Sequence, residues 1–129
     1  MERKHNPVCW FEIYVNDMER AKSFYGNVLQ LELTDAPKME GMDTMQMAFF
    51  PWLENQPNAA GALVKMDGIC AGMGGTMIYF QCEDCSVEES RVEAAGGKVH
   101  QPKMSIGEFG FCSMCIDTEG NMFGLHSMK

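Results

Sequence analysis

The chain has 129 residues and a formal net charge of −8, a length that suits one compact domain or two tightly paired half-domains. The acidic balance argues against a nucleic acid or an anionic membrane as partner, because either would require a basic surface. No stretch approaches the roughly 20 apolar residues of a membrane helix. The start at residues 1–5 carries charges of both signs and no secretory signal, so we expect a cytoplasmic protein.

The first half of the chain predicts one helix among four strands. A strand at residues 8–15 leads into a helix at 18–29, and strands follow at 31–36, 45–51 and 60–66. Asn16 and Asp17 supply side-chain oxygens that can cap the helix. The helix is expected to bury an apolar stripe formed by Ala21, Phe24, Tyr25, Val28 and Leu29.

The second half predicts the same order of elements. Residues 67–75 hold four glycines and form a linker. A strand at 76–82 precedes a helix at 86–95, which Gly96 and Gly97 end with a left-handed cap. Three strands complete this half, one beginning at Val99 and two at residues 110–116 and 121–127, with a tight turn at 117–121.

The two halves form an internal repeat. Residues 13–17 (IYVND) and residues 80–84 (FQCED) end equivalent strands 67 positions apart. This repeat predicts an α+β fold of two βαβββ modules, at about 7–66 and 76–129. We expect the modules to form curved mixed sheets around a cavity, where a small ligand would bind. Whether they pair within one chain or between two chains stays open.

Two motifs carry a family resemblance. Residues 15–25 (VNDMERAKSFY) match a V-x-D-x-x-R-(small)-x-x-F-Y pattern, and residues 117–121 (DTEGN) match a D-P-(D/E)-G-N turn. With them the chain resembles, over about residues 8–127, the vicinal oxygen chelate superfamily. This group includes glyoxalase I, bleomycin-resistance proteins, fosfomycin-modifying enzymes and extradiol dioxygenases, and the likeness is greatest to small bacterial glyoxalase-related proteins. The resemblance implies the paired-module fold and a homodimer.

Metal-binding members of that superfamily carry His, Gln or Glu at four inward strand positions. The resemblance puts Trp10, Met77 and Gly124 at three of them, and Ala62 or Leu63 at the fourth. None of these side chains supplies the imidazole, carboxylate or thiolate that a divalent metal requires. We therefore expect no metal or other cofactor, and no glyoxalase I or dioxygenase mechanism at the usual site.

Strand alternation predicts which side chains line the cavity. If Trp10 points inward, so do Glu12 and Tyr14, while Phe11, Ile13 and Val15 pack against the helices. Aromatic and methionine walls with a few polar groups are typical of a small-molecule site. The expected ligand-binding residues are Trp10, Tyr14, Met47, Phe49, Met77, Tyr79, Gln81, Phe109 and His126.

Three of the candidates have alternative interpretations. Glu12, desolvated beside aromatic rings, would have a raised pKa and act as general base, or it lies at a wet mouth and bonds a neighbouring tyrosine. His126 is an acid–base partner or a surface histidine. The loop at 105–110 is a lid whose Phe109 touches ligand, or only a strand connector.

Six cysteines are expected to be mostly free thiols in a reducing compartment. Two C-x-x-C pairs, Cys82 with Cys85 and Cys112 with Cys115, are compatible with a zinc site. However, Cys112 and Cys115 lie an odd number of residues apart in one strand and point to opposite faces. In the resembled fold the last strand also separates the two pairs. These points favour buried thiols over zinc, and redox pairing stays open.

Three functions remain in competition. The chain is a metal-free small-molecule binder, such as a drug-sequestering resistance-type protein whose negative charge favours cationic ligands. Alternatively, it is a metal-independent lyase or isomerase in which Glu12 moves a proton, or a partner-binding module without any ligand. The inward polar and aromatic residues favour the first two, and the ligand itself is not defined by the sequence.

Overall fold

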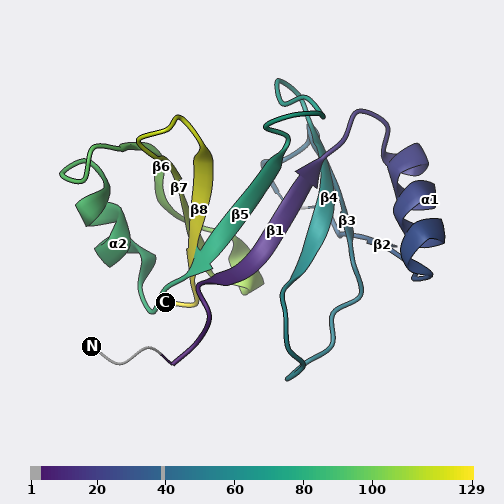
Figure 1. Ribbon diagram of the computed structural model, residues 1–129, viewed down its shortest axis with the longest axis horizontal. Coiled ribbons are helices and arrows are strands. Elements are labelled where there is room, and N and C mark those ends of the chain that lie inside the picture. Colours follow the sequence, from purple (N-terminus) through teal and green to yellow (C-terminus); the bar gives the residue numbers. More distant parts are fainter. Residues whose placement is uncertain (1–3, 39) are drawn as a thin grey trace. The chain divides into compact units, whose positions relative to one another are not determined.

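The computed structural model describes residues 4–38 and 40–129 (Figure 1). Of the segment 1–5 considered for a signal, residues 1–3 lie outside this part. The chain divides into two compact units. The first, which we call the N-terminal unit, is Trp10–Thr76. The second, the C-terminal unit, combines Met77–Lys129 with residues 4–9. No helix in the described part is both long and apolar enough to cross a membrane.

The N-terminal unit is a four-stranded mixed sheet with one helix. Its strands lie in the order β2-β3-β4-β1, with β1 parallel to β4 and the other pairs antiparallel. The helix α1 packs against β3 and β4 (Figure 1). The elements are β1 (Val8–Tyr14, of which residues 10–14 belong to this unit), α1 (Met18–Leu29), β2 (Thr34–Asp35), β3 (Met45–Phe49) and β4 (Ala60–Met66).

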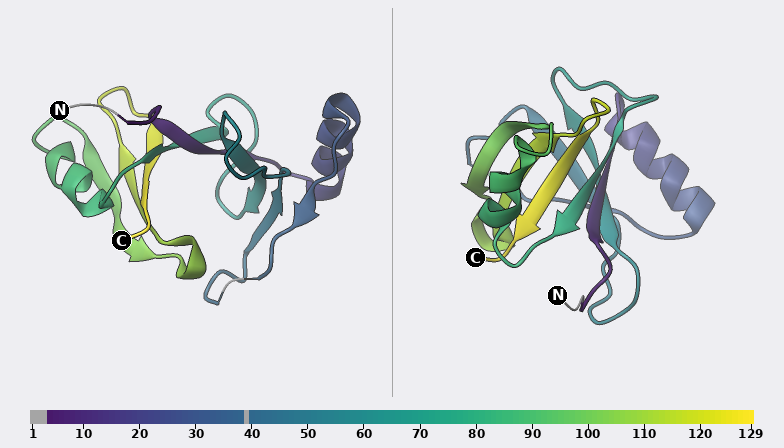
Figure 2. Two further views of the ribbon diagram at one scale, coloured as in Figure 1. Left: turned by 90° about the horizontal axis from the view of Figure 1, so that it is seen from below. Right: turned by 60° about the vertical axis from the view of Figure 1, so that its left-hand side comes forward.

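The C-terminal unit repeats this arrangement. Its strands lie in the order β5-β8-β7-β6, with β5 parallel to β8, and α2 packs against β6, β7 and β8 (Figure 2). The predicted α+β class with two βαβββ modules is therefore confirmed. The elements are β5 (Thr76–Gln81), α2 (Cys85–Val92), β6 (Lys98–Ser105), the short 3₁₀ helix η1 (Gly107–Phe109), β7 (Phe111–Ile116) and β8 (Met122–Ser127).

Both helices begin at an aspartate in the equivalent position of the repeat. Asp17 has extended backbone geometry and accepts a 3.0 Å hydrogen bond from the Arg20 amide. Asp84 has the same geometry and accepts from the Ser86 amide, also at 3.0 Å. A carboxylate here satisfies an amide that the first helical turn leaves unpaired. The cap predicted for α1 is thus present, and α2 has an equivalent cap that the sequence analysis did not predict.

The apolar stripe predicted on α1 is only partly correct. Ala21 and Tyr25 pack against the buried core formed by Val15, Met18 and residues of the sheet. Phe24, Val28 and Leu29 are exposed, at 58%, 61% and 53%. Successive helical residues are about 100° apart, so only one side of a wide stripe can reach a sheet. The remaining apolar residues of α1 face away from that core.

The second predicted strand is wrong in length, because β2 contains only Thr34 and Asp35 rather than residues 31–36. Gln30 adopts a left-handed conformation with φ of 54°, and the Leu31 amide bonds back to the carbonyl of Gly26. Leu31 and Leu33 then pack into the α1 core. Burial of these side chains next to the helix end replaces strand pairing over residues 31–33.

The core under α2 contains thiols in place of larger side chains. Cys82, Cys85, Cys115 and Leu125 are buried together, with Phe80 and Phe123 packed against them. The helix ends at Val92 rather than at the predicted residue 95, and a turn leads to Gly96, where φ is 101°. The Gly97 amide bonds to the Val92 carbonyl at 3.0 Å and closes this end.

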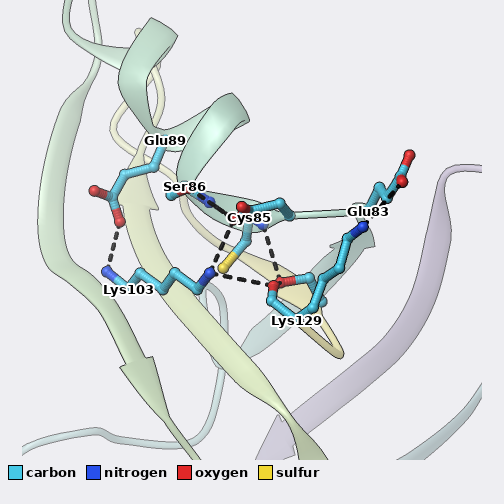
Figure 3. Close-up of polar contacts among 8 residues, drawn as sticks. Glu83, Cys85, Ser86, Glu89, Lys103 and Lys129 are labelled. Atoms are coloured by element: carbon cyan, nitrogen blue, oxygen red, sulfur yellow. Dashed lines mark hydrogen bonds and ion pairs between the residues drawn. The ribbon is translucent and has the colours of Figure 1, made fainter.

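A polar cluster anchors the start of α2 to β6 (Figure 3). Lys103 Nζ lies 2.9 Å from Asp84 Oδ1 and 3.1 Å from the Lys129 backbone oxygen, and the Lys103 amide donates to Glu89 at 2.6 Å. The buried Ser127 hydroxyl accepts from the Cys85 amide at 3.0 Å. Hydrogen bonds from Ser86, followed by those from Lys103, hold the pKa of Asp84 well below its usual range.

Candidate functional site

The sheet face of the N-terminal unit opposite α1 gathers the candidates of the first module. Phe11, Ile13 and Val15 pack with the α1 core, as predicted. The residues between them in β1 therefore lie on the other face. The register adds neighbours to that face: Glu12 pairs with Ala62, which pairs with Phe49, and Tyr14 pairs with Val64, which pairs with Met47. This face holds Trp10, Glu12, Tyr14, Met47, Phe49, Ala62 and Val64.

Glu12 is the polar centre of this face. Its side chain is buried, with 8% of the residue exposed. Tyr14 donates a 2.9 Å hydrogen bond to Oε1, and the Trp10 indole donates to Oε2 at 3.3 Å. The interpretation in which Glu12 bonds a neighbouring tyrosine is confirmed. The water-exposed position that went with it is wrong, because Glu12 is buried. Two donors at separate oxygens suit an ionised carboxylate.

The same hydrogen bond perturbs the tyrosine. Burial, followed by the negative charge of Glu12 and the hydrogen bond to it, raises the pKa of Tyr14 far above its ordinary value. The raised pKa keeps Tyr14 protonated, and a donor toward Glu12, even above the pH at which an ordinary tyrosine ionises. The Trp10 and Phe49 rings meet edge to face, with centroids 5.9 Å apart and planes at 77°. Glu12 therefore sits beside an aromatic wall.

The sheet face of the C-terminal unit opposite α2 carries the candidates of the second module. Phe80, Phe123 and Leu125 pack with the α2 core, so Met77, Tyr79, Gln81 and His126 lie on the other face. Met77 and Tyr79 are buried, whereas Gln81 is exposed. The register pairs Tyr79 with Gly124 and Gln81 with His126. These four side chains therefore lie on the face opposite α2, as strand alternation predicted.

His126 contacts the segment predicted as a lid or connector. Its Nε2 atom lies 2.6 Å from the backbone oxygen of Phe109. Phe109 ends the 3₁₀ helix η1, and its own side chain is partly exposed. Neither the 3₁₀ turn nor the contact with His126 was predicted, because two glycines around an aromatic residue suggested only a loop that is a lid or a strand connector.

The four positions at which the sequence resemblance places metal ligands carry side chains that do not fit a metal in this chain. The Trp10 indole nitrogen is a donor to Glu12, and Met77 and Ala62 or Leu63 offer only thioether or hydrocarbon. At Gly124 a Cβ atom would overlap the Tyr79 ring, so the space beside this backbone is filled. In residues 4–38 and 40–129 no three His, Cys, Asp or Glu side chains come together as a metal site.

The cysteines separate between the two faces as predicted. Cys115 lies in the α2 core, whereas Cys112 pairs with His126 on the opposite face. Strand β8 lies between β5 and β7, but it does not keep the two pairs apart as predicted, because Cys82 and Cys85 are buried in the same cluster as Cys115. Burial, followed by the charge of Glu88, raises the pKa of Cys82 to about 12. Burial likewise raises the pKa of Cys115, so these thiols are poor nucleophiles.

A concave region on the N-terminal unit was missed by the sequence reasoning. It is an open depression of about 500 Å³ between α1, the end of β1 and residues 71–76. Phe24 and Tyr25, whose rings meet edge to face at 5.1 Å, form one wall, and Arg20 lies on its lining. The adjacent aromatic residues Phe24 and Tyr25 were the only signal in the sequence. Their place in a predicted apolar stripe suggested a core position instead.

The duplicated βαβββ topology and the buried polar centre on a sheet face define the class of paired βαβββ-module proteins. A family model described as the Glyoxalase/Bleomycin resistance protein/Dioxygenase superfamily matches residues 8–125, and the chain belongs to this superfamily. No curated protein gives a significant sequence match.

Solved structures with the same fold share little sequence with the chain. A hypothetical protein from Bacillus halodurans C-125 is 14% identical with a TM-score of 0.72, covering 98% of this chain and 96% of that one. Methylmalonyl-CoA epimerase variants from Streptomyces coelicolor, in complex with 2-nitronate-propionyl-CoA, are similar at 15% identity and a TM-score of 0.68. One of them covers 94% of this chain and 93% of its own. The Mycobacterium tuberculosis methylmalonyl-CoA epimerase is 13% identical, with a TM-score of 0.68 and coverage of 95% and 88%.

Proposed function

We propose that the chain is a metal-free binding protein for a small, partly apolar ligand, and that the ligand contacts the sheet faces opposite the helices. The observation that carries this proposal is the buried Glu12, bonded by Tyr14 and Trp10 beside the Phe49 ring. An apolar surface with one fixed polar group is how small-molecule sites combine affinity with orientation. The contacts proposed to ligand are Trp10, Tyr14, Met47, Phe49, Met77, Tyr79, Gln81, Phe109 and His126.

Trp10 fluorescence tests the binding proposal directly. The chain has two tryptophans, and Trp52 is 71% exposed in the loop after β3, so Trp52→Phe leaves Trp10 as the reporter. Aromatic and cationic small molecules would be titrated into this variant, together with methylmalonyl-CoA, the compound in the name of the structurally similar epimerases. We expect saturable quenching by at least one aromatic compound. A flat response to the whole panel contradicts the proposal.

The metal-free part of the proposal has its own measurement. Elemental analysis of protein purified without chelators should find far less than one metal ion per chain, because the residues at the four positions are not metal donors. Stoichiometric zinc, nickel or iron that survives dialysis would contradict it. This result does not depend on which ligand binds.

A second candidate function is a metal-independent lyase or isomerase with Glu12 as general base. It is supported by the burial of a carboxylate whose two oxygens are held by fixed donors. Glu12→Gln keeps the size of the side chain and removes the charge. Unchanged ligand affinity with turnover abolished supports catalysis. If Glu12→Gln instead weakens the binding of a cationic ligand, the result supports a resistance-type sequestering protein. The net charge of −8 would also favour cationic ligands.

The proposed assembly is a homodimer, supported by the exposed Phe24, Val28 and Leu29 on α1. Apolar side chains grouped on one helix commonly mark a protein interface. Sedimentation equilibrium should give twice the chain mass, and Val28→Lys should shift it toward the monomer. A wild-type protein that sediments as a monomer at all concentrations contradicts the dimer and leaves the ligand proposal intact.

A further inference from the structure

The contact between His126 and Phe109 fixes where the imidazole carries its proton. Nε2 of His126 lies 2.6 Å from the backbone oxygen of Phe109. A carbonyl oxygen can only accept a hydrogen bond, so Nε2 must donate. A neutral imidazole has one protonated nitrogen, and Nδ1 is then the nitrogen with the lone pair. The backbone of η1 therefore selects one tautomer of His126.

The turn around Phe109 holds the carbonyl that accepts the hydrogen bond from His126. The Ile106 amide bonds to the Gly110 oxygen at 2.8 Å, and the Gly110 amide bonds to the Gly107 oxygen at 3.2 Å. Gly107 and Gly110 have φ of 70° and 98°, which favour glycine. A Cβ atom on Gly110 would overlap the carbonyl oxygen of Ser127, the residue after His126. The turn is thus packed against the same strand that carries the imidazole.

The other ring nitrogen is the one available to a ligand. No hydrogen bond to Nδ1 of His126 occurs within residues 4–38 and 40–129, and the side chain is only half-buried. Its register neighbours on this face are Gln81 on β5 and Cys112 on β7. The two oxygens of Glu12, by contrast, already accept bonds from Trp10 and Tyr14.

We propose that His126, held by the Phe109 carbonyl as the Nε2–H tautomer, presents Nδ1 as the proton acceptor for a ligand that carries an O–H or N–H group. The inference rests on the proposed function, because it assigns the ligand chemistry of the same face. If the proton transfers completely, it moves from the ligand oxygen or nitrogen to Nδ1. The charge of the ligand falls by one, and the imidazolium keeps its Nε2–H bond to Phe109. Phe109 acts through His126 and is a positioning residue.

The tautomer is measurable without any ligand. The chain has three histidines, so their imidazole ¹⁵N and ¹³C signals can be assigned separately. At about pH 9, above the ordinary titration range of histidine, His126 should show the Nε2–H pattern. Gly107→Ala strains the turn that holds Phe109 and should move His126 toward a mixture of tautomers. Gly120→Ala is the matched control, because both glycines have positive φ and open space around the added Cβ.

The ligand part is tested by a pair of compounds that differ in one donor. Phenol should bind more tightly than anisole, by roughly fivefold for one net hydrogen bond. His126→Phe keeps a ring of similar shape but removes both imidazole nitrogens, so no acceptor is left for the phenol O–H, and it should abolish this preference. A wild-type Nδ1–H tautomer, or equal affinity for the two compounds, overturns the inference and leaves the binding proposal standing. If neither compound binds while other compounds quench Trp10, only the assigned ligand chemistry fails; if nothing binds, both proposals fail.

Discussion

The Tyr14 hydroxyl and the Glu12 carboxylate, two residues apart in β1, form a 2.9 Å hydrogen bond on the face opposite α1. Tyr14→Phe removes the donor and leaves Oε1 of a buried carboxylate without it. We expect unfolding free energy to fall by about 1–3 kcal/mol, the cost of removing one hydrogen-bond donor from a buried charged group, as measured by urea denaturation. Tyr25→Phe, in the α1 core, is the control and should change stability less. Equal losses of unfolding free energy in the two variants would show that the hydrogen bond to Glu12 adds no stability beyond that of an ordinary tyrosine hydroxyl.

Gly124 and Tyr79 give a prediction about packing on the other unit. A Cβ atom at residue 124 would overlap the Tyr79 ring, which pairs with it across β5 and β8. Gly124→Ala should therefore destabilise the protein by about 1–3 kcal/mol through overpacking, measured by thermal or urea unfolding. In a Tyr79→Leu background the same substitution should cost less, because the ring is gone. Additive effects of the two substitutions on stability would contradict a direct overlap between the added Cβ atom and the Tyr79 ring.

Asp84 gives a prediction about acid stability. Its pKa is lower in the folded protein than in the unfolded chain, because Ser86 and Lys103 bond the charged form. The stabilisation is present above the ordinary aspartate pKa of about 3.9 and is lost as pH falls through the lower folded value. Asp84→Asn should thus reduce stability at pH 7, with a difference from wild type that shrinks below about pH 4. Asp67→Asn, at an exposed position of the N-terminal unit, is the control, and a difference independent of pH would refute the assignment.

The six thiols should differ sharply in reactivity. Cys70 is exposed in the segment 67–75 of the N-terminal unit, whereas Cys82, Cys85, Cys112 and Cys115 are buried. Burial raises the pKa of Cys9, Cys82 and Cys115, which lowers the thiolate fraction at neutral pH. Iodoacetamide at about pH 8, near the ordinary cysteine pKa, should modify Cys70 first, and mass spectrometry of peptides identifies the site.

Cys70→Ser is the control for that experiment and should remove the fast phase. The remaining thiols should react only after unfolding. Rapid modification of Cys82 or Cys85 in the folded protein would contradict buried structural thiols and favour the redox interpretation.

Local signals predicted much of the fold. The bounds of α1 and β4 agree with the sequence prediction because a capping aspartate and a run of apolar residues bounded by turns define them. Strand β2 was overestimated because Leu31 and Leu33 are apolar for packing against α1 and not for pairing in the sheet. The exposure of Phe24 and Val28 likewise depends on how α1 lies on β3 and β4, which periodicity cannot define.

The candidate site was predictable at the level of faces and not of contacts. Alternation within β1 and β5 is enough to separate Glu12 from Phe11 and Tyr79 from Phe80. The bond from Trp10 to Glu12 requires a particular indole orientation, and the contact of His126 with Phe109 requires the fold of η1. Both contacts depend on side-chain rotamers, and the second also depends on the conformation of a turn that its two glycines do not specify.

The first residues of β1 belong to the C-terminal unit, although they precede the whole N-terminal unit in the chain. Pro7 accepts a 2.9 Å hydrogen bond from the Gln81 amide, and the Cys9 thiol reaches the Tyr79 oxygen at 3.7 Å. A polypeptide severed within residues 67–75 would consequently leave part of one half attached to the other. Neither fragment would carry its own complete set of backbone partners, so the duplicated sequence is not a pair of independent building blocks that recombination could exchange at that point.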